Sequence, residues 1–160
     1  MNTVDLLCTV NGRAADITVP VRTTAAELLR DRLGLCGTKV SCELQVCGAC
    51  TILVDDQPVS SCSVLAADLD GRSVDTIEGL KRGGELHPLQ AAFWEHNAFQ
   101  CGFCTPGFLM MAKALLDETP DPTPEQVRDW LDGNLCRCTG YRPIEEAVLA
   151  AAGAGGGGKR

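Results

Sequence analysis

The 160-residue sequence is poor in aromatic residues, in histidine and in positive charge. Aromatic side chains make up only 4% of it, so a small core has to be held together by something besides ring packing. The two histidines, His87 and His96, stand in no paired or Cys-x-His arrangement, which leaves a His-containing zinc site or a Rieske-type cluster without ligands. A formal net charge of −7 argues against a nucleic-acid partner.

Long apolar runs, targeting signals and motifs of an active site are missing as well. No apolar run reaches the roughly 18 residues that a membrane span needs. Residues 1–8 contain no basic stretch, long apolar stretch or twin-arginine pair, so we expect no export signal and a cytoplasmic location. Because no P-loop, G-x-S-x-G motif or dinucleotide-binding motif is present, the sequence offers no catalytic site of its own.

What the sequence has in abundance is cysteine, with ten residues. In a reducing compartment, dense and regularly spaced cysteines hold metal more often than they form disulfides. The thiolate is the metal ligand, and the N–H groups at a helix start favour that anion. Eight of the ten cysteines fall into two groups of four. The first group is Cys42, Cys47, Cys50 and Cys62, and the second is Cys101, Cys104, Cys136 and Cys138.

The spacing of each group predicts an inorganic centre. The first group reads Cys-x4-Cys-x2-Cys, with the fourth cysteine after eleven further residues, which is the plant-type ferredoxin spacing for a [2Fe–2S] cluster. The second consists of Cys-x2-Cys and Cys-x-Cys pairs, each followed by threonine and a turn. Because four thiolates saturate each site, we expect electron transfer rather than bond chemistry. Of the two cysteines outside the groups, Cys8 is predicted to be a buried apolar residue and Cys36 a free loop thiol.

Residue periodicity predicts an α+β chain with two domains. Alternation over 3–10 and 15–19, joined at Asn11-Gly12, predicts a hairpin, and a capped helix follows Thr24. Together they indicate a β-grasp domain, with further strands at 51–54, 59–62 and 72–77. Helices are expected at 88–97, 105–117, 124–132 and 143–152, with Thr105 and Thr123 as N-caps and an internal pseudo-twofold. The predicted limits are a β-grasp domain at 1–78, a linker at 79–86, a four-helix domain at 87–152 and a disordered Gly-rich tail at 153–160.

Three motifs closely resemble the small iron–sulfur subunit of the molybdenum hydroxylases. They are C-E-L-Q-V-C-G-A-C-T, Q-C-G-F-C-T-P-G and G-N-L-C-R-C-T-G-Y, and the likeness extends from the first hairpin to about Ala152. That family includes xanthine dehydrogenases, aldehyde oxidoreductases, carbon monoxide dehydrogenases and N-heterocycle hydroxylases. The resemblance implies a plant-type ferredoxin domain and a four-helix domain with one [2Fe–2S] cluster each.

The same resemblance implies partner subunits and their cofactors. A large subunit would hold molybdenum on molybdopterin, as the cytosine dinucleotide, and a medium subunit would hold FAD, in an (αβγ)2 complex. Electrons would pass from molybdenum to the cluster of the helical domain, then to the ferredoxin-type cluster and to FAD. Gln100 and Cys138 match family positions that lie against the pterin, although Gln100 could equally be a hydrogen bonder that stabilises its loop. Carbon monoxide, aldehydes, purines and other N-heterocycles all remain candidate substrates.

The first cysteine loop departs from the family pattern at three positions. Family members commonly have glycine where this chain has Ser41 and Gln45, and threonine where it has Cys36. Glycine permits a positive φ, so the Gln45 side chain has to point outward or the loop has to shift. Two rival hypotheses also stay open, namely a free-standing two-cluster ferredoxin and a structural module held together by zinc.

Overall fold

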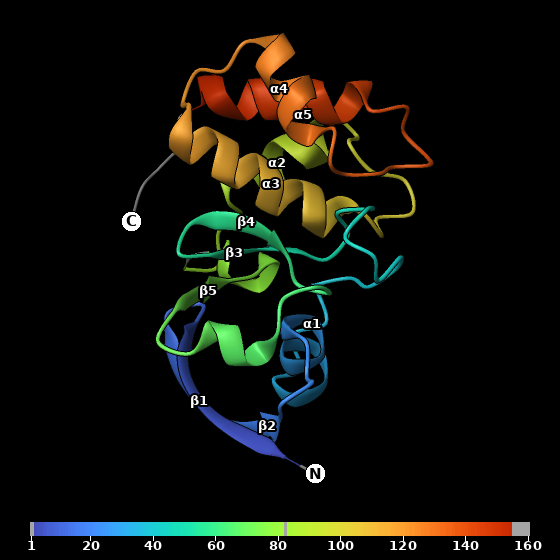
Figure 1. Ribbon diagram of the computed structural model, residues 1–160. Coiled ribbons are helices and arrows are strands. Elements are labelled where there is room, and N and C mark those ends of the chain that lie inside the picture. The colour runs from blue at the N-terminus through green and yellow to red at the C-terminus, as the bar shows by residue number, and fades with distance from the viewer. Residues whose placement is uncertain (1, 82, 155–160) are drawn as a thin grey trace.

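The computed structural model describes residues 2–81 and 83–154, and it shows a β-rich half stacked against a helical half (Figure 1). The α+β class is as expected. The strands are β1 (Thr3–Val10), β2 (Arg13–Pro20), β3 (Thr51–Val54), β4 (Gln57–Ser60) and β5 (Ser73–Asp75). The α-helices are α1 (Ala25–Glu27), α2 (Pro88–Glu95), α3 (Thr105–Glu118), α4 (Pro124–Leu131) and α5 (Arg142–Gly153). A π-helical segment (Leu28–Arg32) extends α1, and 3-10 helices span Ala66–Leu69 and Ile77–Gly79.

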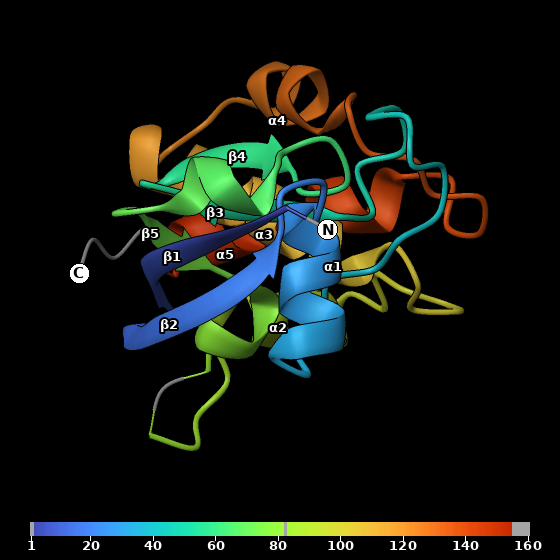
Figure 2. The same ribbon diagram turned by 60° about the horizontal axis from the view of Figure 1, so that its bottom comes forward.

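The β-rich half is a mixed sheet that packs on a short helix. Its strands lie in the order β2-β1-β5-β3-β4, with β1 and β5 parallel and the other neighbours antiparallel. The predicted alternation along β1 is confirmed, because Leu6, Cys8 and Val10 are buried on the face that meets Leu28 and Leu29. Figure 2 shows α1 lying beside the β1–β2 hairpin. The arrangement is that of a β-grasp fold, with Cys8 as one of its small core residues.

Strand β3 belongs to two hydrophobic cores at once. Ile52 and Val54 lie in the core of the β-rich half, whereas Leu53 lies in the core of the helical half with Phe108 and Leu109 of α3. Successive strand side chains point to opposite faces, so α3 packs on the face that α1 leaves open. In Figure 1, α3 lies directly above β3 and β4. The two halves are therefore packed together through a shared strand and are not joined only by a flexible linker.

The segment between the halves is itself packed. Leu80, inside the predicted linker, is buried in the core of the helical half. In that half α2 packs against α5, and α3 packs against α4. The four expected helices are present, while the pseudo-twofold and the domain limits stay predictions.

The predicted β-strand limits were wrong at the second hairpin. Asp55 and Asp56 form a two-residue turn with φ values of 49° and 65°, so β4 begins at Gln57 and ends before Cys62. Positive φ at both turn residues matches the right-handed twist of a hairpin. Pro58 is tolerated because β4 is an edge strand. Strand β5 is likewise shorter than the predicted 72–77.

Two of the three predicted helix caps are confirmed and one is wrong. Thr24 and Thr123 each form a capping box with the residue three positions later. Thr105, in contrast, is the first residue of α3, while Cys104 occupies the cap position without a side-chain hydrogen bond. Pro106 therefore stands second in the helix.

Two further helical limits differ from expectation. After α1 the Leu33 N–H donates to the Leu28 carbonyl, one residue further back than in an α-helix, so the second half of that helix is widened. Gly153 still belongs to α5, so the helix runs one residue past its predicted end, while residues 155–160 of the predicted tail lie outside the described residues. Within the described ranges, none of the helices combines the length and apolar character that crossing a membrane requires.

Replacing Leu53 by Ala should destabilise the protein by about 2–5 kcal/mol, because the lost side chain leaves a cavity where the two halves meet. Leu53 is 3% exposed, whereas Leu7 on β1 is 57% exposed and serves as the matched control. Leu7→Ala should change the free energy of unfolding by less than about 0.5 kcal/mol. Denaturant titration of the purified holoprotein measures both values, and equal losses in the two variants would contradict the shared role of β3.

Candidate metal centres

The loops that carry the cysteine groups lie on one side of the molecule. Residues 36–50, 98–104 and 132–141 form the cyan, yellow and orange loops at the right of Figures 1 and 2. A hydrogen bond joins the first and third of these loops, because the Leu135 N–H donates to the Cys47 carbonyl at 2.9 Å. Segments far apart in sequence thus bring the two predicted groups next to each other.

In the first group, the β3–β4 hairpin brings together two of the cysteines. Cys50 immediately precedes β3 and Cys62 follows β4, and the strand register pairs Thr51 with Ser60. Ser61 reinforces this contact, since its hydroxyl donates to the Cys50 carbonyl at 2.7 Å. Burial raises the pKa of Cys50 to about 11.

The other two cysteines of the first group lie in a loop whose N–H groups converge on sulfur. Glu43 and Gln45 both have positive φ, 55° and 58°, and the Leu44 N–H donates to Cys42 Sγ at 3.4 Å. Hydrogen bonds from the N–H groups of Leu44, Val46 and Cys47 lower the pKa of Cys42 to about 6. The turn thus stabilises a thiolate.

The three departures from the family pattern all lie on the outside of this loop. The Gln45 side chain is exposed, which is the outward arrangement expected of a residue at a usual glycine position. Ser41 and Cys36 are exposed as well. The Cys36 carbonyl accepts hydrogen bonds from Arg30 and Lys39, so the residue helps to close the loop through its backbone. That its thiol is not a ligand stays a prediction.

The cysteines of the second group come from two loops and form two pairs. Each pair contains one cysteine from each loop. Cys101 and Cys138 have their Sγ atoms 3.6 Å apart, and Cys104 lies beside Cys136. Burial, with the contact to Cys136, raises the pKa of Cys104 to about 12. Burial thus outweighs the hydrogen bond from the Cys104 backbone N–H, which by itself lowers the pKa.

Cys136 behaves in the opposite way. Burial alone would raise its pKa, but hydrogen bonds from Thr139, Cys138 and Cys104 together outweigh burial and the pKa is lowered. The Thr139 hydroxyl donates to Cys136 Sγ at 3.1 Å and the Thr139 N–H at 3.5 Å. Tyr141 supports the same turn, since its hydroxyl accepts from the Cys136 N–H at 3.2 Å. Sequence reasoning missed both residues, although each follows the Cys-x-Cys pair closely.

Gln100 lies beside Cys138. Its Nε2 donates to the Cys138 carbonyl at 3.0 Å and so joins the two loops of the second group. The interpretation as a loop-stabilising hydrogen bonder therefore has direct support, and the pterin contact of Gln100 and Cys138 stays a prediction. Both side chains are exposed at the protein surface.

The cysteines are arranged in pairs, which fits binuclear centres. Each iron of an all-cysteine [2Fe–2S] cluster takes two thiolates, so such a cluster needs two pairs. The pairs in contact are Cys42 with Cys47, Cys50 with Cys62, Cys101 with Cys138, and Cys104 with Cys136. In the described part of the chain, no three His, Cys, Asp or Glu side chains gather around the position of a single ion.

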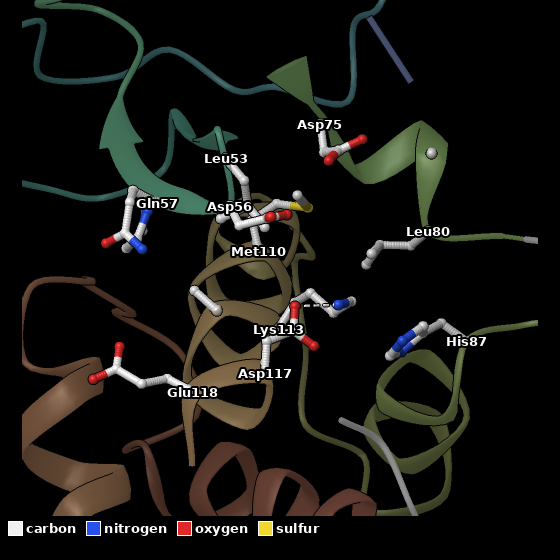
Figure 3. Close-up of a pocket in the computed structure, with 13 residues that line it drawn as sticks. Leu53, Asp56, Gln57, Asp75, Leu80, His87, Met110, Lys113, Asp117 and Glu118 are labelled. Atoms are coloured by element: carbon white, nitrogen blue, oxygen red, sulfur yellow. Dashed lines mark hydrogen bonds and ion pairs between the residues drawn. The ribbon is translucent and has the colours of Figure 1, made fainter. Parts of the chain in front are cut away.

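A cavity of about 500 Å³ lies away from the cysteines, between the β3–β4 hairpin and α3 (Figure 3). Its lining includes Asp56, Asp75 and His87 but none of the ten cysteines. Lys113 extends from α3 beside the cavity and forms an ion pair with Asp117 one helical turn later. The cavity thus lies between the two halves, has polar residues in its lining and is separate from the cysteine groups.

Two known protein families match the two halves of the chain. The family described as "2Fe-2S iron-sulfur cluster binding domain" matches residues 8–76, and the family described as "[2Fe-2S] binding domain" matches residues 76–149. The chain thus contains two [2Fe–2S]-binding domains, as the two cysteine groups predicted.

Curated relatives match this chain over nearly its whole length. The nicotine 6-hydroxylase small subunit of Paenarthrobacter nicotinovorans is 55% identical over 150 residues, covering 94% of this chain and 90% of the relative. The nicotinate dehydrogenase small FeS subunit of Eubacterium barkeri is 43% identical over 151 residues, covering 94% and 96%. The chain belongs to the small [2Fe–2S] subunits of the molybdenum hydroxylases.

A solved structure agrees with this family assignment. The crystal structure of quinoline 2-oxidoreductase from Pseudomonas putida 86 contains a chain that is 45% identical, with a TM-score of 0.93 and 96% of each chain covered. As a member of the molybdenum hydroxylase small subunits, the chain is an iron–sulfur electron-transfer subunit of such a complex. The predicted family, fold class and electron-transfer function are confirmed, and the zinc-module hypothesis loses its support.

Thr139→Val should lower the reduction potential of the helical-domain cluster. A hydrogen bond to a ligand sulfur stabilises the more negative, reduced state, so losing about 1 kcal/mol of that preference corresponds to about 40 mV for one electron. Thr139→Ser keeps the hydroxyl and should keep the potential. Redox titration of the holoprotein, followed by electron paramagnetic resonance (EPR), compares the two variants, and identical potentials would show that the Thr139 hydroxyl does not tune the centre.

Proposed function

We propose that this chain relays electrons between a molybdenum subunit and a flavin subunit through two [2Fe–2S] centres. The first is held by Cys42, Cys47, Cys50 and Cys62, and the second by Cys101, Cys104, Cys136 and Cys138. The observation that carries the proposal is the meeting of the two cysteine loops at the Leu135–Cys47 hydrogen bond. Bound clusters would accept and donate one electron at a time without changing their ligands.

The proposed partners set the direction of electron transfer, from the molybdenum subunit to the flavin subunit. The helical-domain group, with Gln100 and Cys138 at the surface, would face the molybdopterin cytosine dinucleotide of a large subunit. The ferredoxin-type group would face FAD on a medium subunit, in an (αβγ)2 complex. The name of the nicotine-hydroxylase relative, a small subunit, supports a multisubunit assembly. The nicotine and quinoline relatives make an N-heterocycle the first substrate class to assay.

Exposed apolar side chains beside both cysteine groups favour a bound subunit over a free-standing ferredoxin. Leu44 and Val46, in the first loop, are 75% and 60% exposed, and Phe103, between two cysteines of the second group, is 47% exposed. Clustered exposed apolar side chains mark protein interfaces. The predicted domain limits, 1–78 and 87–152, complete the proposal. The cytoplasmic location stays a prediction.

Native purification of this chain with its partners tests the proposal as a whole. Iron, acid-labile sulfide, molybdenum and flavin should be present at about four, four, one and one per copy, because two [2Fe–2S] centres would serve one molybdenum site and one FAD. Four irons without molybdenum or flavin would instead favour the free-standing ferredoxin. Zinc in place of iron would overturn the assignment of both centres.

Cys136→Ala should remove about half of the iron, since loss of one ligand disrupts only the centre of the helical domain. The first centre should keep its EPR signal, while electrons should accumulate at molybdenum. Cys36→Thr is the matched control, because Cys36 lies outside the four cysteine pairs, and it should keep both centres. Full iron in Cys136→Ala, or half the iron in Cys36→Thr, would show that the ligand assignment is wrong.

A further inference from the structure

The two cysteine loops meet around one glycine. Gly48, which follows Cys47, lies between the loop before Cys136 and the first turn of α3. A Cβ built on Gly48 would lie 2.5 Å from Cγ of Asn134. On the other side, a Cβ on Gly107 would lie 2.2 Å from the Gly48 carbonyl oxygen. The backbone at Gly107 therefore lies directly against the Gly48 carbonyl, while the Asn134 side chain lies on the other side of Gly48.

Two consecutive residues of the second loop bond to two consecutive carbonyls of the first. The Leu135 N–H donates to the Cys47 carbonyl at 2.9 Å, and Asn134 Nδ2 donates to the Gly48 carbonyl at 3.0 Å. Asn134 is 1% exposed, and its backbone N–H is tied to the Leu131 carbonyl at the end of α4. The Asn134 side chain is therefore held in place by burial, and it links the helical half to the ferredoxin-type loop.

This contact links a cysteine of each group by a short path through the backbone. From Cys47 the path follows that residue's own backbone to its carbonyl, crosses one hydrogen bond to the Leu135 amide, and enters Cys136 through the next peptide bond. The Leu135 side chain plays no part in the path. The path is continuous only while the Leu135 amide lies within hydrogen-bond distance of the Cys47 carbonyl.

We propose that Asn134 is a positioning residue for electron transfer between the two centres, because its bond to Gly48 holds the Leu135 amide on the Cys47 carbonyl. The inference rests on the proposed ligand sets. In the step concerned, one electron leaves the reduced helical-domain cluster and reduces the oxidised ferredoxin-type cluster, and no covalent bond forms or breaks. The Asn134 side chain donates to the Gly48 carbonyl rather than to a cysteine sulfur, and in this proposal it acts by fixing the distance between the loops.

The test is Asn134→Leu in the intact complex, which keeps the side-chain size and removes the amide donor. Iron content should stay at the wild-type value, while transfer between the centres, followed by rapid-freeze EPR after substrate reduction, should slow about tenfold or more. The magnetic interaction between the two reduced clusters should weaken as well. Leu53→Ala is the control, since it removes packing between the halves but leaves the hydrogen bonds between the loops in place, and it should leave the transfer rate unchanged.

Each remaining outcome also decides the question. Full iron with an unchanged transfer rate and unchanged magnetic interaction would overturn the inference. If Asn134→Leu loses iron, Asn134→Ala is measured in the same way, and loss of iron from both variants would overturn it in favour of a folding role. An equal slowing in Leu53→Ala would overturn it in favour of a general effect of packing. Failure of the proposed function would look different, because the wild-type complex itself would then lack four irons or show no transfer between two centres.

Discussion

The burial of β3 between two cores is the constraint on which the rest of the structure depends. Ile52 and Val54 anchor the strand in one half and Leu53 in the other, and burying each such side chain contributes roughly 1.5–3 kcal/mol. Since cores are close-packed, the halves have little freedom to rotate about this strand. Cys50 directly precedes β3. Helix α3, which packs on β3, starts directly after Cys104. The shared strand thus places both cysteine groups on one side of the molecule, and there hydrogen bonds of their own join the two loops.

The thiol chemistry of the sites follows from the same packing. Cys50 and Cys104 lie against the cores, where an uncompensated charge is costly, and burial raises the pKa of both. Cys42 and Cys136 receive hydrogen bonds from turns, which lower their pKa values. Each group therefore combines a thiol whose pKa is lowered by hydrogen bonds from a turn with a thiol whose pKa is raised by burial.

Local signals in the sequence were sufficient for the family, the two cysteine groups and most of the elements. The Asn11-Gly12 hairpin and the capping boxes at Thr24 and Thr123 depend on neighbours in sequence, and all three are confirmed. Thr105 failed as a cap because the turn that carries Cys104 takes the cap position. The contact of Asn134 was beyond prediction, since its partner lies 86 residues away and the two meet only once both halves are packed.

The departures from the family pattern leave the contact between the loops intact. Ser41, Gln45 and Cys36 are exposed, so their side chains face solvent or a partner, whereas Gly48 is buried against the helical half. A Cβ at Gly48 would collide with Asn134, which would push the loops apart, but a side chain at Gln45 only has to tolerate a positive φ. The outer face of the first loop can therefore change, and with it solvent access to the cluster, without altering the spacing between the centres.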